Sequence, residues 1–235
     1  MSLSIGHIIL RITTITVYAE YWLIGSVFIS SYILGFVRYN LEESAPFDKR
    51  KSFQDLGLAN VITLIRGLFL GLLAGFIFLP RPEGIFVLIP GLLYGASLGG
   101  DYLDGYVAKH LNGETALGAR LDMELDSLGV LIASLVAYSY GMIPIWVLIT
   151  VGSARYLFVF GKWMRKKMGK PVFELPDKTS RLIIGDVLRV FLFLAILPLF
   201  HSSSSRIAAS ILAVIFLAGF VRDWLIVIGA IENYD

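Results

Sequence analysis

The chain has 235 residues, of which 57% are hydrophobic and only 16% are charged, and its mean hydropathy is +0.76. Soluble domains carry a charge on about a quarter of their residues, so this composition excludes a disordered chain, a nucleic-acid-binding arm and an ordinary soluble globular protein. The formal net charge is +2, and the sequence contains no cysteine for disulfides, zinc ligation or nucleophilic catalysis. The class that remains is an all-α, polytopic membrane helical bundle.

Seven stretches are apolar for about the 20 residues that a transmembrane helix needs. They cover residues 14–37, 58–80, 84–106, 117–141, 143–163, 180–200 and 207–230. The first stretch is the least regular, because it contains Glu20 and Tyr21 and follows Arg11, so a helix lying in the membrane interface is its alternative. No charged segment and small-residue cleavage site flank it, which disfavours a cleaved signal peptide.

Basic residues concentrate in every second loop. Three loops hold Arg38, Lys49, Arg50 and Lys51; Lys109 and Arg120; and Lys162, Arg165, Lys166, Lys167, Lys170, Lys178 and Arg181. The intervening loops contain little more than Arg81 and Arg206. The positive-inside rule therefore predicts that the basic loops face the cytoplasm, with the N-terminus outside if the first helix spans.

Glycine recurs at four-residue spacing in the second and third apolar stretches. The two sets are Gly67, Gly71 and Gly75, and Gly91, Gly95 and Gly99. Small residues at this spacing lie on one face of a helix and let neighbouring transmembrane backbones approach closely. Both faces are therefore predicted to pack tightly against other helices.

Four aspartates follow at helical spacing around the third and fourth stretches. Asp101 and Asp104 lie one turn apart on one helix face, and Asp122 and Asp126 lie one turn apart on the next helix. Glu124 falls on a different face from its two neighbours. The short connection between the helices makes them antiparallel neighbours, so the two pairs of carboxylates are predicted to face each other near the cytoplasmic surface.

Such a cluster requires compensation, because an ionisable residue at membrane depth costs roughly 2.5–3.5 kcal/mol. Two like charges 4 Å apart repel by about 4 kcal/mol at an effective dielectric of 20. Some of the carboxylates are therefore protonated, or cations lie between them. An all-oxygen ligand set favours Mg²⁺ or Mn²⁺ over zinc, and paired metal ions suit displacement at phosphorus.

Three other interpretations of the aspartates stay open. Asp101 and Asp122 are candidates for ion coupling in a transporter, although transporters more often show internal repeats. An intramembrane, Mg-dependent prenyltransferase also binds diphosphate through aspartates, but in two segments far apart in sequence. The third interpretation is that the aspartates are solvated loop charges outside the bilayer.

The aspartate region resembles the CDP-alcohol phosphotransferase (CDP-alcohol phosphatidyltransferase) family. The family pattern is D-x-x-D-G-x-x-A-R, eight residues, then G-x-x-x-D-x-x-x-D. It is matched in identity and spacing by Asp101, Asp104, Gly105, Ala108, Gly118, Asp122 and Asp126. Lys109 replaces the family's usual arginine, which keeps the charge but loses the bidentate fork. The resemblance implies a six-helix core over residues 58–235, with residues 1–57 forming an extra N-terminal helix and a linker.

The resemblance also implies a reaction and a set of roles. A substituted phosphoryl group would pass from a CDP-alcohol, expected to be CDP-diacylglycerol, to a polar alcohol acceptor with release of CMP, in phospholipid biosynthesis. Two Mg²⁺ or Mn²⁺ ions would be held by Asp101, Asp104, Asp122 and Asp126, with Asp126 also the general base. Nucleotide contacts would come from Thr63, Gly105, Ala108, Lys109 and Gly118. Thr63 belongs to an Asn60-x-x-Thr63-x-x-Arg66 run similar to the family's first core helix, although a helix start with a snorkelling arginine explains that run equally well. A homodimer is a further implication.

Four cationic residues outside the motif are candidates for binding an anionic acceptor headgroup, such as inositol phosphate or glycerol 3-phosphate. They are Arg155, Lys178, Arg181 and Arg189. The structural alternative is that Arg189 pairs with Asp186 three residues away and that Lys178 and Arg181 only set the topology. Serine as the acceptor stays open.

Overall fold

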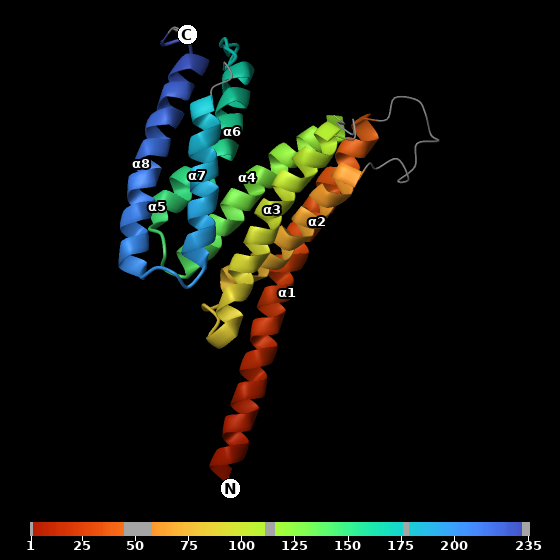
Figure 1. Cartoon of the computed structure of the whole chain (residues 1–235), viewed down its shortest axis with the longest axis vertical. Coiled ribbons are helices and arrows are strands. Elements are labelled where there is room, and N and C mark those ends of the chain that lie inside the picture. The colour runs from red at the N-terminus through yellow and green to blue at the C-terminus, as the bar shows by residue number, and fades with distance from the viewer. Residues whose placement is uncertain (1, 45–57, 111–115, 176–178, 232–235) are drawn as a thin grey trace. The chain divides into compact units, whose positions relative to one another are not determined.

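The computed structural model describes residues 2–44, 58–110, 116–175 and 179–231, and this part of the chain contains helices and no strand. It divides into two compact units, Met1–Ile132 and Ala133–Asp235. Figure 1 shows that helices make up both units. The prediction of an all-α polytopic membrane bundle is confirmed, whereas the division at residues 57 and 58 stays a prediction.

The first unit contains the four helices that position the aspartates. They are α1 (Ser2–Ser44), α2 (Leu58–Ala74) with a 3₁₀ turn η2 (Gly75–Phe78), α3 (Ile89–His110), preceded by the 3₁₀ turn η3 (Gly84–Leu88), and α4 (Ala116–Ser139). Helix α1 is much longer than the predicted stretch of residues 14–37, and it runs along α2 and η2 before continuing toward the N-terminus (Figure 1). The extra N-terminal helix is therefore packed onto the rest of its unit.

The predicted glycine face of α2 forms the contact with α1. A Cβ atom added to Gly67 would lie 3.2 Å from Ile33 of α1, and one added to Gly75 would lie 2.5 Å from the Trp22 ring. From the opposite side, a Cβ on Gly25 would lie 2.7 Å from the Ala74 carbonyl oxygen. Tight packing of this face is confirmed, and it depends on both helices lacking side chains at the contact.

The predicted glycine face of α3 is wrong at Gly99. No atom lies within 4 Å of a Cβ built on Gly99, so this glycine makes no close helix contact within the described part of the chain. The helix instead packs through buried Tyr94, and a Cβ on Gly100 would lie 2.5 Å from Arg66 of α2. The four-residue spacing of the glycines places them on one face of the helix, but it does not show which neighbouring helix packs against that face.

The second unit comprises the end of α4 and five further elements. They are α5 (Ile145–Val147), a wide π-type turn η4 (Leu148–Gly152), α6 (Ala154–Lys167), α7 (Thr179–Ile196) and α8 (Ser202–Val227), and the first four all contact α8. Phe158 of α6 packs edge-on against Phe220 and Trp224 of α8, with ring centroids 5.7 Å apart in both pairs. A Cβ on Gly161 would lie 2.5 Å from the Trp224 ring, so this glycine gives the indole its space.

The apolar stretch predicted over residues 143–163 forms two helical segments with a bend between them, not one continuous helix. The chain bends by 55° between η4 and α6 at Ser153. The Thr150 hydroxyl donates to the Trp146 carbonyl oxygen at 2.8 Å, and the Ser153 hydroxyl donates to that of Ile149. Such back-bonding competes with the helix ladder and bends helices, and π-type turns are another common site of kinks.

Four helices in the described part are long and apolar enough to cross a membrane, and a fifth span results if the bent pair counts as one. Helix α4 occupies the predicted fourth stretch but fails this test, because it carries Arg120, Asp122, Glu124 and Asp126. Large apolar side chains such as Phe28, Leu92 and Ile207 are more than half exposed. Apolar side chains exposed on long helices are typical of lipid-facing surfaces, so these features identify an integral membrane protein.

Candidate functional site

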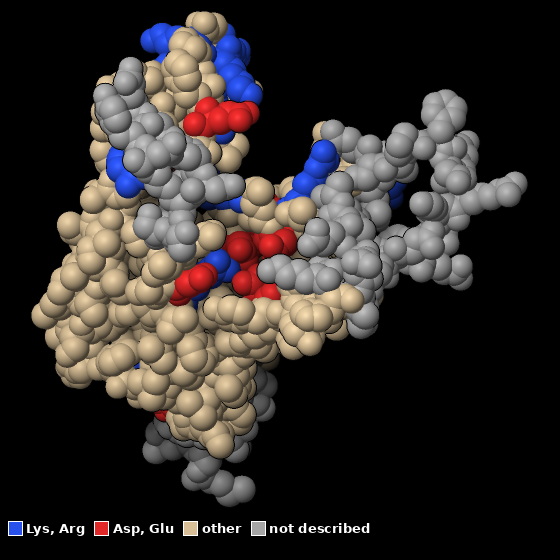
Figure 2. All heavy atoms as spheres, turned by 45° about the horizontal axis from the view of Figure 1, so that its top comes forward, with Lys and Arg blue, Asp and Glu red and all other residues tan. Residues whose placement is uncertain are grey.

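Three helices of the first unit each contribute to one polar cluster. Helix α2 supplies Thr63 and Arg66, α3 supplies Asp101 and Asp104, and α4 supplies Asp122 and Asp126. Figure 2 shows a group of acidic side chains in the middle of the view, with a basic side chain beside them. The predicted helix faces therefore bring the four carboxylates together.

Arg66 lies at the centre of the cluster. Its Nη1 lies 2.8 Å from Asp104 Oδ2 and 2.6 Å from Asp122 Oδ1. Its Nη2 lies 2.7 Å from Asp101 Oδ1 and 2.9 Å from Asp126 Oδ1. One guanidinium thus contacts all four carboxylates, while only 3% of the Arg66 side chain is exposed.

Sequence reasoning did not assign this role to Arg66. From its sequence context alone, Arg66 is interpreted as part of a family-like helix or as an arginine reaching the membrane surface. The available signal was an arginine one turn after Thr63, well inside an apolar helix, where a charge needs a partner. Helix periodicity did not show that the faces of α3 and α4 would surround it.

Asp104 differs from the other three aspartates. Its side chain is 7% exposed, against 20% for Asp101, 29% for Asp126 and 47% for Asp122. The Thr63 hydroxyl donates to Asp104 Oδ2 at 2.9 Å, so this oxygen accepts from both α2 residues. Asp104 therefore joins α3 to α2, and the other three carboxylates form the accessible side of the cluster.

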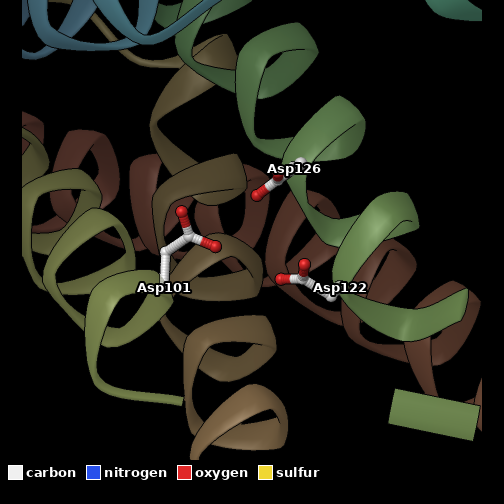
Figure 3. A group of neighbouring side chains, drawn as sticks. All are labelled: Asp101, Asp122 and Asp126. Atoms are coloured by element: carbon white, nitrogen blue, oxygen red, sulfur yellow. The ribbon is translucent and has the colours of Figure 1, made fainter. Parts of the chain in front are cut away.

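The accessible carboxylates have a donor set that suits a hard divalent cation. Asp101, Asp122 and Asp126 each offer an oxygen that lies within 4.8 Å of the other two. Figure 3 shows the three side chains pointing toward one another from α3 and α4. In an octahedral Mg²⁺ site with ligand distances of about 2.0–2.1 Å, neighbouring ligand oxygens are about 2.9 Å apart and opposing ones about 4.2 Å, so the three oxygens would move closer together on binding one ion. A single guanidinium carries one positive charge, which by itself would not balance four ionised carboxylates.

Glu124 belongs to a different contact. It accepts a hydrogen bond from the Tyr32 hydroxyl of α1 at 2.7 Å and is largely buried. Arg120, one turn before it, donates to Asn40 of α1 at 3.1 Å. The prediction that Glu124 faces away from Asp122 and Asp126 is confirmed, and α1 holds the face of α4 that does not carry the aspartates.

The glycine and alanine positions of the motif are described only in part. Gly105 is exposed, and no atom lies within 4 Å of a Cβ built on it, so the α3 surface next to Asp104 is open there. Gly118 is half-buried on α4. The side chains of Ala108 and Lys109 lie outside the described residues, and their roles stay predictions.

The four candidate acceptor cations belong to the second unit. Arg189 forms an ion pair with Asp186 at 2.9 Å, as the structural alternative predicted. Arg155 lies in the first turn of α6, directly after the bend at Ser153. Lys178 and the side chain of Arg181 lie outside the described residues, so convergence of this set on the aspartates stays a prediction.

Comparison with known proteins adds one finding to this geometry. The model of the family described as CDP-alcohol phosphatidyltransferase matches residues 56–184, which is more than half of the chain and includes every residue of the aspartate cluster. Searches of curated proteins and of solved structures find no significant match. The family match and the carboxylates that α3 and α4 bring together lead to the same conclusion: the chain belongs to the CDP-alcohol phosphatidyltransferase family.

Proposed function

We propose that this chain transfers the phosphatidyl group of CDP-diacylglycerol to the hydroxyl of a polar acceptor and releases CMP, as a step of phospholipid biosynthesis. The observation that carries the proposal is the carboxylate cluster of α3 and α4 within the family match. The acceptor is a phosphorylated polyol such as inositol phosphate or glycerol 3-phosphate. The active face lies on the cytoplasmic side of the membrane.

Two Mg²⁺ or Mn²⁺ ions are the proposed cofactors, because the cluster offers only oxygen donors and one guanidinium by itself would not balance four ionised carboxylates. Asp101, Asp122 and Asp126 would hold them together with Asp104, which is oriented by Thr63. When bound, divalent ions supply neutralisation of the diphosphate charge, the main requirement of phosphoryl transfer. The residues of the chain provide position and proton transfer.

Asp126 is the proposed general base. Its side chain is partly exposed and lies on the same helix face as Asp122, one turn further along α4. The acceptor oxygen would bond to the phosphorus that carries the diacylglycerol, while the bond from that phosphorus to the CMP oxygen breaks. The acceptor proton passes to Asp126, and such proton transfer typically accelerates a reaction by 10²–10⁴-fold, as an order of magnitude.

The nucleotide is proposed to lie along the open surface of α3 beside Gly105, where a side chain is lacking. Ala108, Lys109 and Gly118 complete this set, and Thr63 contributes through Asp104, to which its hydroxyl donates. Arg155, Lys178, Arg181 and Arg189 are proposed to bind the acceptor phosphate. Arg189 would then exchange its ion pair with Asp186 for the ligand. A homodimer remains part of the proposal.

The experiment is CMP release by the purified protein in lipid micelles. CDP-diacylglycerol is offered with inositol phosphate, glycerol 3-phosphate, inositol, glycerol or serine, with and without Mg²⁺ or Mn²⁺, and the lipid product is identified by mass spectrometry. We expect CMP and a phosphatidyl product only with a divalent metal and a phosphorylated polyol. Transfer to serine alone would overturn the acceptor assignment.

Two further arms separate the other classes of function. A product from a prenyl diphosphate and an aromatic acceptor would identify an intramembrane prenyltransferase. Ion-gradient-dependent flux in proteoliposomes without CMP release would identify a transporter. Either result in place of CMP release would overturn the proposed reaction.

A further inference from the structure

Arg66 contacts the carboxylates that would hold the proposed metal ions. Its guanidinium contacts Asp101, Asp122 and Asp126, the same three carboxylates whose oxygens lie within 4.8 Å of one another. A buried guanidinium requires counter-charge, and four neighbouring carboxylates require a cation. Without a metal ion, each therefore satisfies the other.

The fold provides a specific space for this arginine. A Cβ atom on Gly100 of α3 would lie 2.5 Å from Arg66 Cγ and 3.1 Å from Cδ. At Gly99, the neighbouring residue of the same helix, a Cβ would meet no atom within 4 Å. Gly100 directly precedes Asp101, so α3 lacks a side chain at the point where the stem of Arg66 passes.

A divalent ion and the guanidinium are expected to compete. Both are cations, both would bind oxygens of the same carboxylates, and positive charges at contact distance repel strongly in a buried site. Metal binding therefore requires Arg66 to give up some of its contacts. Either the guanidinium of Arg66 or the divalent ion then compensates the negative charge of these carboxylates.

We propose that Arg66 is the counter-ion of the metal-free site and that divalent metal binding displaces its guanidinium from the carboxylates that take up the metal. This inference rests on the proposed metal site, and it assigns to Arg66 a role that the aspartates alone do not have. Arg66 stabilises the aspartate cluster when no metal is bound, and it sets the affinity of the cluster for metal. Gly100 positions Arg66 for this role.

The test measures metal binding directly, apart from catalysis. The electron paramagnetic resonance signal of free Mn²⁺ is titrated against the purified, full-length protein in detergent, without nucleotide. Arg66→Gln is expected to bind Mn²⁺ at least about tenfold more tightly than the wild type, since the competing cation is gone. Its apparent melting temperature without metal should be lower, and the rise on adding Mn²⁺ should be larger. Arg66→Lys, which keeps the charge but loses the fork, should lie between the two.

A matched pair on α3 tests the same idea while Arg66 is kept. Gly100→Ala should displace the arginine stem, lower the stability of the metal-free protein and strengthen Mn²⁺ binding, whereas Gly99→Ala should leave Mn²⁺ binding unchanged and should not lower the stability. Equal or weaker Mn²⁺ binding by Arg66→Gln would overturn the proposal. If that variant cannot be purified, Mn²⁺ affinity of Gly100→Ala equal to that of Gly99→Ala would overturn it alone.

The outcome is independent of the proposed reaction. Tighter Mn²⁺ binding by Arg66→Gln, with no CMP release by the wild type, would support the counter-ion and reject the phosphatidyl transfer. Metal-dependent CMP release by the wild type, with unchanged Mn²⁺ affinity in both Arg66→Gln and Gly100→Ala, would support the phosphatidyl transfer and reject the counter-ion role of Arg66.

Discussion

Asp122 and Glu124 are two residues apart on α4, yet they contact different helices. Asp122 contacts Arg66 of α2 at 2.6 Å, whereas Glu124 accepts from Tyr32 of α1 at 2.7 Å. The separation follows from the helix, in which a step of two residues turns a side chain about 200° around the axis. Two acidic residues close together in the sequence thus have different roles: Asp122 belongs to the candidate reaction centre, and Glu124 belongs to a packing contact.

This difference gives the sharpest residue-level prediction. Asp122→Asn should lower metal-dependent CMP release at least about 100-fold, the order lost when one electrostatic contact to a transition state is removed. Glu124→Gln, which keeps a polar partner for Tyr32, should change the rate little. The rates are measured on purified variants at saturating Mg²⁺, and equal losses would contradict the assignment of the two helix faces.

At the scale of elements, the contact of α1 with α2 requires glycine on both helices. A Cβ on Gly25 would lie 2.7 Å from a backbone oxygen of α2, which cannot rotate away as a side chain can. A Cβ atom built on Gly35, ten residues later on α1, has no atom within 4 Å. The two glycines therefore form a natural pair for testing the contact.

Gly25→Ala should lower the free energy of unfolding by about 1–3 kcal/mol, as overpacking does. Gly35→Ala should leave it unchanged or raise it by up to about 1 kcal/mol, because alanine favours the helix. Thermal unfolding of both variants in the same detergent is the measurement. A loss of stability in Gly35→Ala that matches that of Gly25→Ala would contradict the packing.

The polar link between α1 and α4 gives a separate prediction. Tyr32→Phe removes the hydroxyl that donates to Glu124 and should cost about 0.5–1.5 kcal/mol of unfolding free energy, the usual net contribution of a hydrogen bond. Tyr39→Phe, at a largely exposed tyrosine of the same helix, is the control. If both variants unfold at the wild-type temperature, the link does not contribute to stability.

The sequence predicted these elements unevenly. Helix positions, the shared faces of the aspartate pairs and the α2 glycine face follow from spacing, because each depends on one helix alone. Three features depend instead on which helices become neighbours. They are the central position of Arg66, the packing of Arg66 against Gly100 and not Gly99, and the hydrogen bond of Tyr32 to Glu124. The bend at Ser153 was missed because hydropathy does not register hydroxyl groups bonded to the helix backbone.

At the scale of the whole molecule, the absence of cysteine allows the orientation of the chain in the membrane to be measured. The chain has no cysteine, so a single introduced cysteine reports its own position. Glu83 lies in the connection between η2 and η3, and Lys170 lies in the basic segment after α6; both side chains are exposed. The positive-inside rule assigns these two positions to opposite sides of the membrane.

Glu83→Cys should react with a membrane-impermeant maleimide in intact cells, and Lys170→Cys should react only after permeabilisation. Labelling is read as a mass shift of the purified protein. The reverse pattern would place the aspartate end of α3 and α4 outside and would contradict the cytoplasmic active face. Labelling of both positions in intact cells would contradict the spans between them.

In the proposed function, the aspartates of α3 and α4 and divalent metal ions form one centre for phosphatidyl transfer. The most direct measurement is the rate of CMP release from CDP-diacylglycerol and a phosphorylated polyol as free Mg²⁺ is raised from a chelated zero, for the wild type and for Asp126→Ala. We predict a rate that rises from none to saturation in the wild type and stays at background in Asp126→Ala. CMP release at full rate without any divalent metal, or by Asp126→Ala, would contradict it.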